Sequence, residues 1–134
     1  MKVEFVVEGK PKGKARPRFT KSGHCYTPVG TSLYEKAVKE AWEKAGAVHL
    51  EGTIKMTVNA VFPIPKSWNK EKREQARYQR IQPTVKPDID NILKVIEDAL
   101  NGYAYDDDKQ ICEVESCKVY EDCNGRVVVK IEEI

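Results

Sequence analysis

The sequence lacks any long apolar run. No stretch of about 18 apolar residues occurs among its 134 residues, which excludes a transmembrane helix. The first five residues do not begin the apolar core of a signal peptide, so we expect a cytoplasmic protein. Internal repeats and low-complexity tracts are also missing. These absences leave one compact domain spanning 1–134 as the expectation.

Histidine is scarce, and the cysteines are spaced unlike zinc ligands. None of the four cysteines forms a C-x-x-C pair, and the two histidines do not complete a zinc spacing. The residues concerned are Cys25, Cys112, Cys117, Cys123, His24 and His49. We therefore expect no structural zinc. Without an export signal, reduced thiols are the expected state.

The net charge of +2 conceals an uneven distribution along the chain. Residues 1–24 carry seven Lys and Arg against two Glu, and residues 66–86 repeat that balance. Residues 87–134 carry five basic against thirteen acidic side chains. The simplest interpretation is a set of solvated faces. The alternative is a polyanion held by the basic segments, with metal ions held by the acidic one.

The hydrophobic pattern predicts a mixed α/β (α+β) domain of order β-α-β-α-α-β-β, in which helices cover a mixed sheet. Residues 9–30 are expected to form a long basic loop, and Thr31 or Ser32 to cap the first helix with Glu35 as partner. Asn124 and Gly125 favour a hairpin between the last two strands. The expected strands are 2–7, 52–62, 110–120 and 126–132, and the expected helices 31–45, 67–78 and 88–100.

Acidic residues gather at the start of the third expected helix. Pro87 fixes the entry to that helix, and either Asp88 or Asp90 would suffice to cap its first turn. A second aspartate followed by Asn91 exceeds what capping requires. Lys94, one turn after Asp90, suits either an ion pair with it or a contact to a phosphate.

A second acidic cluster, Asp106-Asp107-Asp108, precedes the next expected strand. It is either a solvated turn or half of a site shared with Asp88 and Asp90. An EF-hand is excluded because the glycine of its sharp turn and its late glutamate are missing. Converging carboxylates repel one another unless a divalent cation neutralises them. Mg²⁺ fits such all-oxygen ligands.

At these residues the sequence resembles the RusA family of Holliday-junction resolvases, which are small endodeoxyribonucleases of phages and prophages. The resemblance covers nearly the whole chain. It is strongest at KPDIDNILKVIEDALNG (86–102) and YDDDKQI (105–111). The upstream GKPKGKARPRF (9–19) and YTP (26–28) also match many members. The resemblance implies a RusA-like fold, a homodimer, and dependence on Mg²⁺, for which Mn²⁺ would substitute.

The resemblance also assigns roles to individual residues. Asp88, Asp90 and Asp108 match the family's catalytic, metal-binding aspartates, and Lys94 matches its functional lysine. Where two aspartates are usual this chain has three, and alignment on Gln110 makes Asp107 a further candidate metal ligand and Asp106 the surplus residue. The implied reaction is hydrolysis of DNA phosphodiester bonds, with Lys94 donating to the phosphate.

The basic segments are the expected DNA-binding surface, which would contact the backbone more than the bases. Phe19, Tyr26 or Tyr103 could stack on an opened base, although packing within the fold is the alternative for each. The candidate DNA-binding residues are Lys10, Lys12, Lys14, Arg16, Arg18, Lys21, Lys72, Arg73, Arg77, Arg80 and Lys86.

Together these features predict an endonuclease that resolves four-way DNA junctions in recombination and repair, in association with the nucleoid. Two alternatives are a branched-DNA-binding protein that does not cleave, and a nuclease acting mainly on forks or flaps. A cation-binding module without DNA would leave both basic segments unexplained. Paired acidic clusters argue against a protein that only binds DNA, because concentrated negative charge repels the phosphate backbone.

Overall fold

The computed structural model describes residues 1–15 and 18–134, with only the backbone at Arg18. Four strands form a sheet of order β1-β6-β4-β5, in which only the β4–β5 pair is parallel. They are β1 (Lys2–Glu8), β4 (Ile54–Pro63), β5 (Ile111–Glu121) and β6 (Arg126–Glu133). The predicted mixed α/β class is confirmed.

Strands β5 and β6 do not form the hairpin that Asn124 and Gly125 suggested. The ten-residue strand β4 lies between them and pairs with both, in parallel with β5 and antiparallel with β6. A local turn signal bends the chain but does not select the partner of a strand. At this turn the N–H of Gly9 donates to the carbonyl of Gly125. A Cβ at Gly125 would lie 2.8 Å from the Cα of Lys10, so glycine at this turn allows the loop after β1 to pass close to it.

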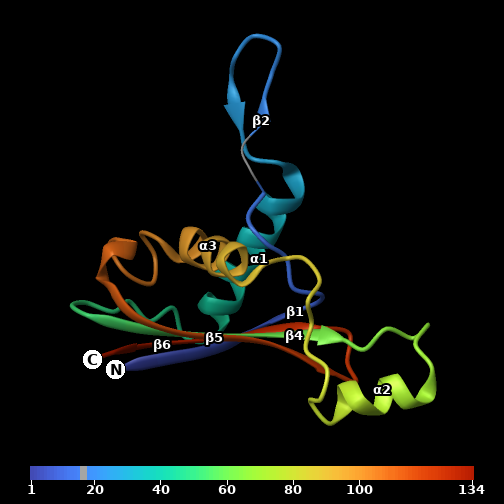
Figure 1. Cartoon of the computed structure of the whole chain (residues 1–134). Helices are drawn as coiled ribbons and strands as arrows, with labels where there is room; N and C mark the ends of the chain where they lie inside the picture. Colours follow the sequence, from blue (N-terminus) through green and yellow to red (C-terminus); the bar gives the residue numbers. More distant parts are fainter. Residues whose placement is uncertain (16–17) are drawn as a thin grey trace.

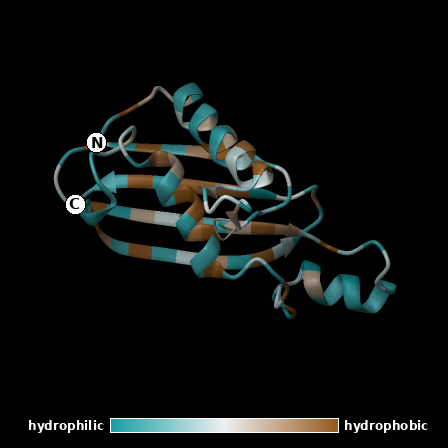
Figure 2. Ribbon diagram, turned by 90° about the horizontal axis from the view of Figure 1, so that it is seen from above, coloured by the Kyte–Doolittle hydropathy of each residue, from teal (hydrophilic) through white to brown (hydrophobic). Residues whose placement is uncertain are grey.

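One face of the sheet is covered by α1 (Val29–Lys44) and α3 (Ile89–Leu100), as Figure 1 shows. The alternating pattern predicted for 52–62 is confirmed, because Ile54, Met56 and Val58 are fully buried beneath these helices. Apolar residues gather where helices and strands meet, whereas α2 (Lys70–Arg77) is mostly hydrophilic and lies beyond the end of the sheet (Figure 2). The opposite face of the sheet has no helix over it in Figure 1.

Helix α1 begins earlier than predicted, and without the expected capping box. Pro28 is its N-cap residue and makes no side-chain capping bond. The hydroxyl of Thr31 accepts a hydrogen bond from the N–H of Ala15 at 3.3 Å. Glu35 is engaged by Lys14. The side chains of Thr31 and Glu35, which the local pattern assigned to capping, are therefore bonded to residues of the preceding loop instead.

The segment predicted as one long loop contains a short hairpin of β2 (Arg18–Phe19) and β3 (Cys25–Tyr26). It stands away from the rest of the molecule at the top of Figure 1. Its turn is closed by the N–H of Thr20 donating to His24 and that of Gly23 donating to Thr20. The Ser22-Gly23 dipeptide is the turn signal that marks this hairpin in the sequence.

Helix α2 begins at Lys70, later than the predicted start at residue 67, and Asn69 caps it by accepting a hydrogen bond from the N–H of Lys72 at 2.8 Å. Helix α3 begins at Ile89 and ends at Leu100, in agreement with the predicted 88–100. Among the described helices, none is long and apolar enough to cross a membrane.

Candidate active site

Two carboxylates lie exposed at the start of α3. Asp88 occupies the N-cap position in an extended conformation, but its side chain makes no capping hydrogen bond. Asp90 lies in the first turn. Within the described part of the chain, neither carboxylate forms an ion pair or a hydrogen bond. The positive end of the helix dipole favours negative charge here. These two carboxylates are therefore open to an external cation.

The side chain of Lys94 lies one turn further along α3. Its Nζ is 3.3 Å from Oδ1 of Asp98, and the side chain is 56% exposed. The alternative ion pair with Asp90 is not formed between these described residues. Residues four apart share a helix face, so Lys94 follows Asp90 on the same side of α3. An exposed ammonium next to a carboxylate pair is well placed to contact a phosphate.

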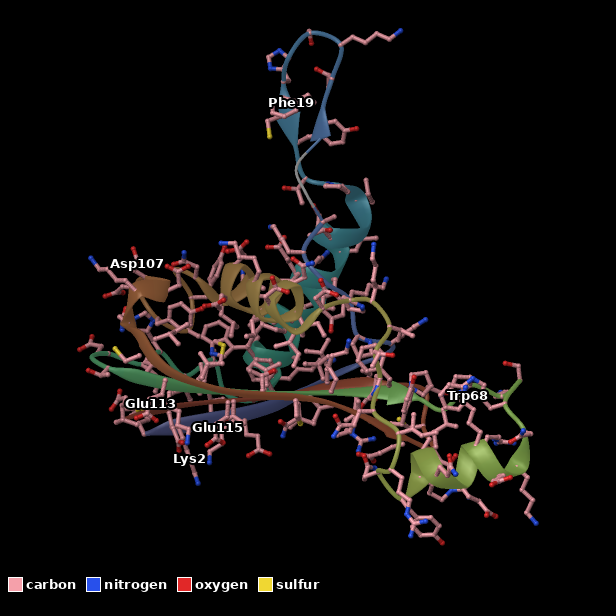
Figure 3. The ribbon with its side chains drawn as sticks, viewed as in Figure 1. Lys2, Phe19, Trp68, Asp107, Glu113 and Glu115 are labelled. Carbon is pink, nitrogen blue, oxygen red and sulfur yellow. The ribbon has the colours of Figure 1, made fainter. Side chains whose placement is uncertain are left out.

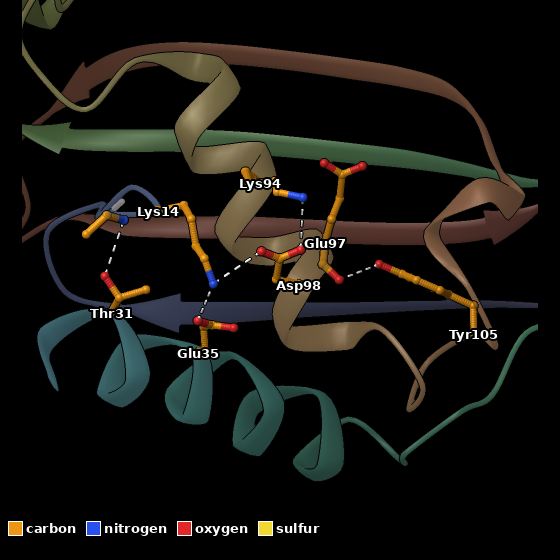
Figure 4. Close-up of polar contacts among 8 residues, drawn as sticks. Lys14, Thr31, Glu35, Lys94, Glu97, Asp98 and Tyr105 are labelled. Carbon is orange, nitrogen blue, oxygen red and sulfur yellow. Dashed lines mark hydrogen bonds and ion pairs between the residues drawn. The ribbon is translucent and has the colours of Figure 1, made fainter. Parts of the chain in front are cut away.

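Lys14 joins three segments of the chain (Figure 4). Its Nζ lies 2.9 Å from Oε1 of Glu35 on α1 and 3.2 Å from Oδ2 of Asp98 on α3. Burial lowers the pKa of the Lys14 ammonium, but the two carboxylates outweigh that effect and hold the pKa above its usual value. The backbone N–H of Lys14 also donates to the carbonyl of Asn91 at 2.9 Å. These contacts argue against the predicted DNA contact of Lys14.

The preceding residue, Gly13, packs directly against the start of α3. A Cβ at this position would lie 2.8 Å from the Cβ of Pro87 and 2.9 Å from the Cβ of Asn91. Real Cβ atoms are not found this close to other carbons, so the approach requires glycine. The basic loop is thereby held against the residues that flank Asp88.

The second acidic cluster lies in a turn that Gln110 organises. Oε1 of Gln110 accepts from the N–H groups of Asp106 and Asp107, and its Nε2 donates to the carbonyl of Gly52. Oδ1 of Asp107 accepts from the N–H of Lys109, which completes a capping box for the short 3₁₀ helix Asp108–Gln110. This backbone bond and the Asp108 side chain lower the pKa of Asp107. Asp107 thus has a structural role besides the predicted ligand role.

Asp106 and Asp108 point to different neighbours. Oδ1 of Asp106, 81% exposed, lies 3.1 Å from Nε2 of His49. Asp108 is close enough to Glu97 for its charge, after burial, to help raise the pKa of the Glu97 carboxyl. Tyr105 donates its hydroxyl to the backbone carbonyl of Glu97 at 2.9 Å. Glu97 was not among the predicted site residues, although its position seven residues after Asp90 puts it on the same helix face.

The donor chemistry of Asp88 and Asp90 fits a hard divalent cation. In the described chain, no three His, Cys, Asp or Glu side chains are gathered closely enough to hold a metal ion together. Asp108 lies beside Glu97, which is about 10 Å along α3 from Asp90 at 1.5 Å per residue. Mg²⁺, however, keeps several waters and needs only one or two carboxylates when substrate phosphates complete its shell. The pair at the start of α3 meets that requirement.

Three hollows meet beside this carboxylate pair, and Lys86 lines all of them. The smallest, about 430 Å³, contains Lys86, Asp88 and Asn91. The next, about 440 Å³, contains Lys10 and Lys12. The largest, about 560 Å³, contains Lys10 and Lys86. The two basic segments of the sequence therefore meet along one groove that ends at Asp88.

The other predicted DNA-binding residues are less uniform. Lys72 lies over the ring of Trp68, with Nζ 4.0 Å from the ring centroid, and Arg77 is paired with Asp122. Arg73 is partly buried and Arg80 is exposed near the end of α2, while Lys21 is exposed at the hairpin turn. Arg16 and the side chain of Arg18 lie outside the described residues. Among the candidates, Lys10, Lys12 and Lys86 are the exposed lysines that line the hollows beside Asp88.

The predicted stacking residues differ in their surroundings. Phe19 and Tyr26 are 71% and 45% exposed on the projecting hairpin, where Figure 3 labels Phe19. Tyr103 packs beside Trp42, with ring centroids 6.4 Å apart, and carries the ammonium of Lys39 over its ring. Tyr103 therefore has packing partners within the fold, although it is 45% exposed. The hairpin aromatics have no such explanation within the described fold.

Comparison with known proteins bears directly on this site. A family model described as "Endodeoxyribonuclease RusA" matches residues 8–132, which include both acidic clusters and the basic loop. YqaN of Bacillus subtilis (strain 168), described as an uncharacterized protein, is 33% identical over 138 aligned positions. That alignment covers 98% of this chain and 96% of YqaN.

Proposed function

The chain belongs to the RusA endodeoxyribonuclease family, and from this premise we propose that it resolves four-way DNA junctions by divalent-metal-dependent phosphodiester hydrolysis. One observation carries the proposal. The aspartates of the D-x-D-N segment lie exposed and unpaired, among the described residues, where a lysine-lined groove meets α3. Free carboxylates beside a basic groove are unfavourable for a protein that only binds DNA, and useful to one that holds a cation against a phosphate.

Each residue near the start of α3 has a distinct task in this proposal. Asp88 and Asp90 would hold the cation together with the phosphate that is cut. When bound, Mg²⁺ polarises the phosphate and offsets the charge of the leaving oxygen. Lys94 extends from the same helix face and would donate to a phosphate oxygen. Lys10 and Lys86 would hold the neighbouring backbone in the groove.

Asp108 is proposed as the third essential carboxylate. Its position after the turn ordered by Gln110 fixes it at the start of β5, beside Glu97. Two carboxylates held near each other repel, and this repulsion falls when a cation approaches either. We therefore include Glu97 as a further acidic residue, and its loss would weaken cation binding beside Asp108.

We also propose that the chain works as a homodimer, since a four-way junction requires two cuts related by two-fold symmetry. The projecting hairpin and the first turns of α1 expose four apolar side chains, of Phe19, Tyr26, Val29 and Leu33. Val29 and Leu33 are 73% and 62% exposed and lie four residues apart on one helix face. Apolar exposure of this kind is typical of a protein interface. Light scattering of Leu33→Lys should then show monomers where the parent chain is dimeric.

The decisive experiment compares cleavage of a labelled four-way junction and of linear duplex with the same sequence, in Mg²⁺ and in EDTA. We expect paired, symmetric cuts on the junction only, and only with metal. Asp90→Asn should abolish cutting and preserve junction binding, because it removes a charge without changing the shape of the side chain. Asp106→Asn is the matched control, since the Asp106 side chain pairs with His49, which has no role in the proposed site.

Each contrary result is informative. Cutting by Asp90→Asn at the parent rate would refute the assignment of the active site. Tight junction binding by the parent chain without cuts would leave only a branched-DNA-binding protein. Equal cutting of forks or flaps and of junctions would replace the proposed substrate with branched DNA in general.

A further inference from the structure

A hollow at the carboxyl ends of β4 and β5 is lined by aromatic rings. Phe62, Trp68 and Tyr120 contribute to its wall, and its volume is about 560 Å³. The rings of Trp68 and Tyr120 meet edge to face, with centroids 5.3 Å apart and planes inclined by 72°. Figure 3 shows Trp68 between the end of the sheet and α2. We call this hollow the aromatic pocket.

Three lysines complete the wall of the aromatic pocket: Lys10, Lys66 and Lys86. They come from three separate segments, the loop after β1, the loop after β4 and the approach to α3. No acidic side chain is among the residues that line it. Phe62 and Tyr120 are 1% and 3% exposed, so Trp68, which is partly exposed, is the ring available to stack on a base. An aromatic ring with ammonium groups around it matches a nucleobase joined to phosphates, because the ring stacks on the base and the cations pair with the backbone. The volume lies within the usual range for small-molecule pockets.

The aromatic pocket shares Lys86 with the hollow that contains Asp88. Only one residue, Pro87, separates Lys86 from Asp88 along the chain. A DNA strand whose phosphate reaches Asp88 would therefore present a nearby nucleotide to the pocket.

We propose that the aromatic pocket binds one unpaired nucleobase of the branched DNA substrate, close to the phosphate that is cut. A base within intact duplex is stacked and cannot enter a concave site, whereas a base at a branch point is opened at lower cost. The pocket would thus select branched DNA and hold the strand in register with Asp88 and Asp90. This inference rests on the proposed function, since it assumes that branched DNA occupies the groove.

The test uses the full chain with 5-fluorotryptophan in place of its two tryptophans, in an Asp90→Asn background that prevents cutting. Trp68→Phe assigns the two fluorine resonances. The probes are a four-way junction, the same junction with abasic sites at the branch point, and linear duplex. We expect the Trp68 resonance to move with the intact junction and to stay in place with duplex. The resonance of Trp42, which is a buried residue of α1, should not move with any probe.

Binding constants give an independent measure. Trp68→Ala should weaken binding of the intact junction about fivefold or more, the usual loss when one stacking aromatic is removed. It should have little effect on the abasic junction, which has no base to lose. Tyr78→Ala is the matched control, because Tyr78 is a 71% exposed aromatic of the same segment that does not line the pocket.

The outcomes separate the pocket from the proposed function. A junction that binds without moving the Trp68 resonance overturns the pocket alone. Equal weakening of intact and abasic junctions by Trp68→Ala does the same, since it indicates a loss unrelated to the base. If the parent chain binds no junction at all, the proposed function is refuted, and so is the proposed ligand of the pocket.

Discussion

Replacing Lys14 by methionine is expected to destabilise the fold through the contact that joins the basic loop to both covering helices. Methionine keeps much of the apolar stem of lysine but removes the ammonium. The carboxylates of Glu35 and Asp98, 22% and 23% exposed, would then face each other without the cation between them. Figure 4 shows how Lys14 lies between these two carboxylates.

The size of the effect follows from burial. Breaking a fully buried ion pair costs about 3–5 kcal/mol, and an exposed one about 0–1 kcal/mol. With each side chain roughly one-fifth exposed, we expect a loss of about 2 kcal/mol for Lys14→Met. That corresponds to a fall in Tm of about 8 °C, at roughly 4 °C per kcal/mol for a domain of this length.

Urea unfolding at pH 7 is the assay, with Lys12→Met as the control on the same loop. Lys12 is exposed, so its replacement should change stability by less than about 0.5 kcal/mol. Adding Glu35→Gln to Lys14→Met should recover part of the loss, because the remaining carboxylate is no longer repelled. Because the pKa of Lys14 is raised, its contribution is complete below the ordinary lysine value of 10.5 and is lost only as the pH rises through the folded value. A loss below 0.5 kcal/mol for Lys14→Met would refute this reasoning.

Three further changes test the site and its support. Gly13→Ala should destabilise the fold by about 1–3 kcal/mol and slow junction cutting, because the new Cβ would lie 2.8 Å from the Cβ of Pro87. Gly30→Ala is the control in both assays, because the space around Gly30 is open. Asp108→Asn should slow junction cutting by roughly a hundredfold or more. Asp107→Asn should slow it less, because an asparagine at 107 can still accept the capping hydrogen bond from the N–H of Lys109. Equal rates for the two variants would contradict the assignment. Tyr105→Phe should lose about 1 kcal/mol in urea unfolding, because a fully buried hydroxyl hydrogen bond disappears, and an unchanged stability would show that this bond contributes nothing.

Periodicity identified the main elements because burial is one-sided. Alternation along Ile54–Pro63 predicted a strand, and the structure buries one face of it under α1 and α3. Pairing was not predictable in the same way. The chain turns at Gly125 as expected. Strand β4, which is long and apolar, nevertheless lies between β5 and β6 and pairs with both, so these two strands do not form a hairpin. The hairpin after Arg18 was missed since two-residue strands leave no periodic pattern.

The candidate site was predictable only where a motif is local. Asp90 and Lys94 lie four residues apart on one helix, so their spacing predicted a common face, and Asp88 is the N-cap residue of the same helix. Glu97 and Trp68 were missed for different reasons. Glu97 is relevant because Asp108 lies near it, and this proximity depends on the turn at Gln110 and not on a local sequence pattern. Trp68 matters through a pocket whose walls come from segments far apart in the sequence.

The acidic end of the chain shows how far composition alone can lead. Its thirteen carboxylates suggested one concentrated site, yet alternate residues of β5 and β6 point to the sheet face without helices. Figure 3 shows Glu113 and Glu115 on that face, and Glu115 pairs with Lys55 at 3.2 Å. For these residues the simpler interpretation, a solvated face, is the right one. In the proposed function the charges that act on DNA are the few at the start of α3 and before β5, so the proposal depends on their positions and not on the net charge of the segment.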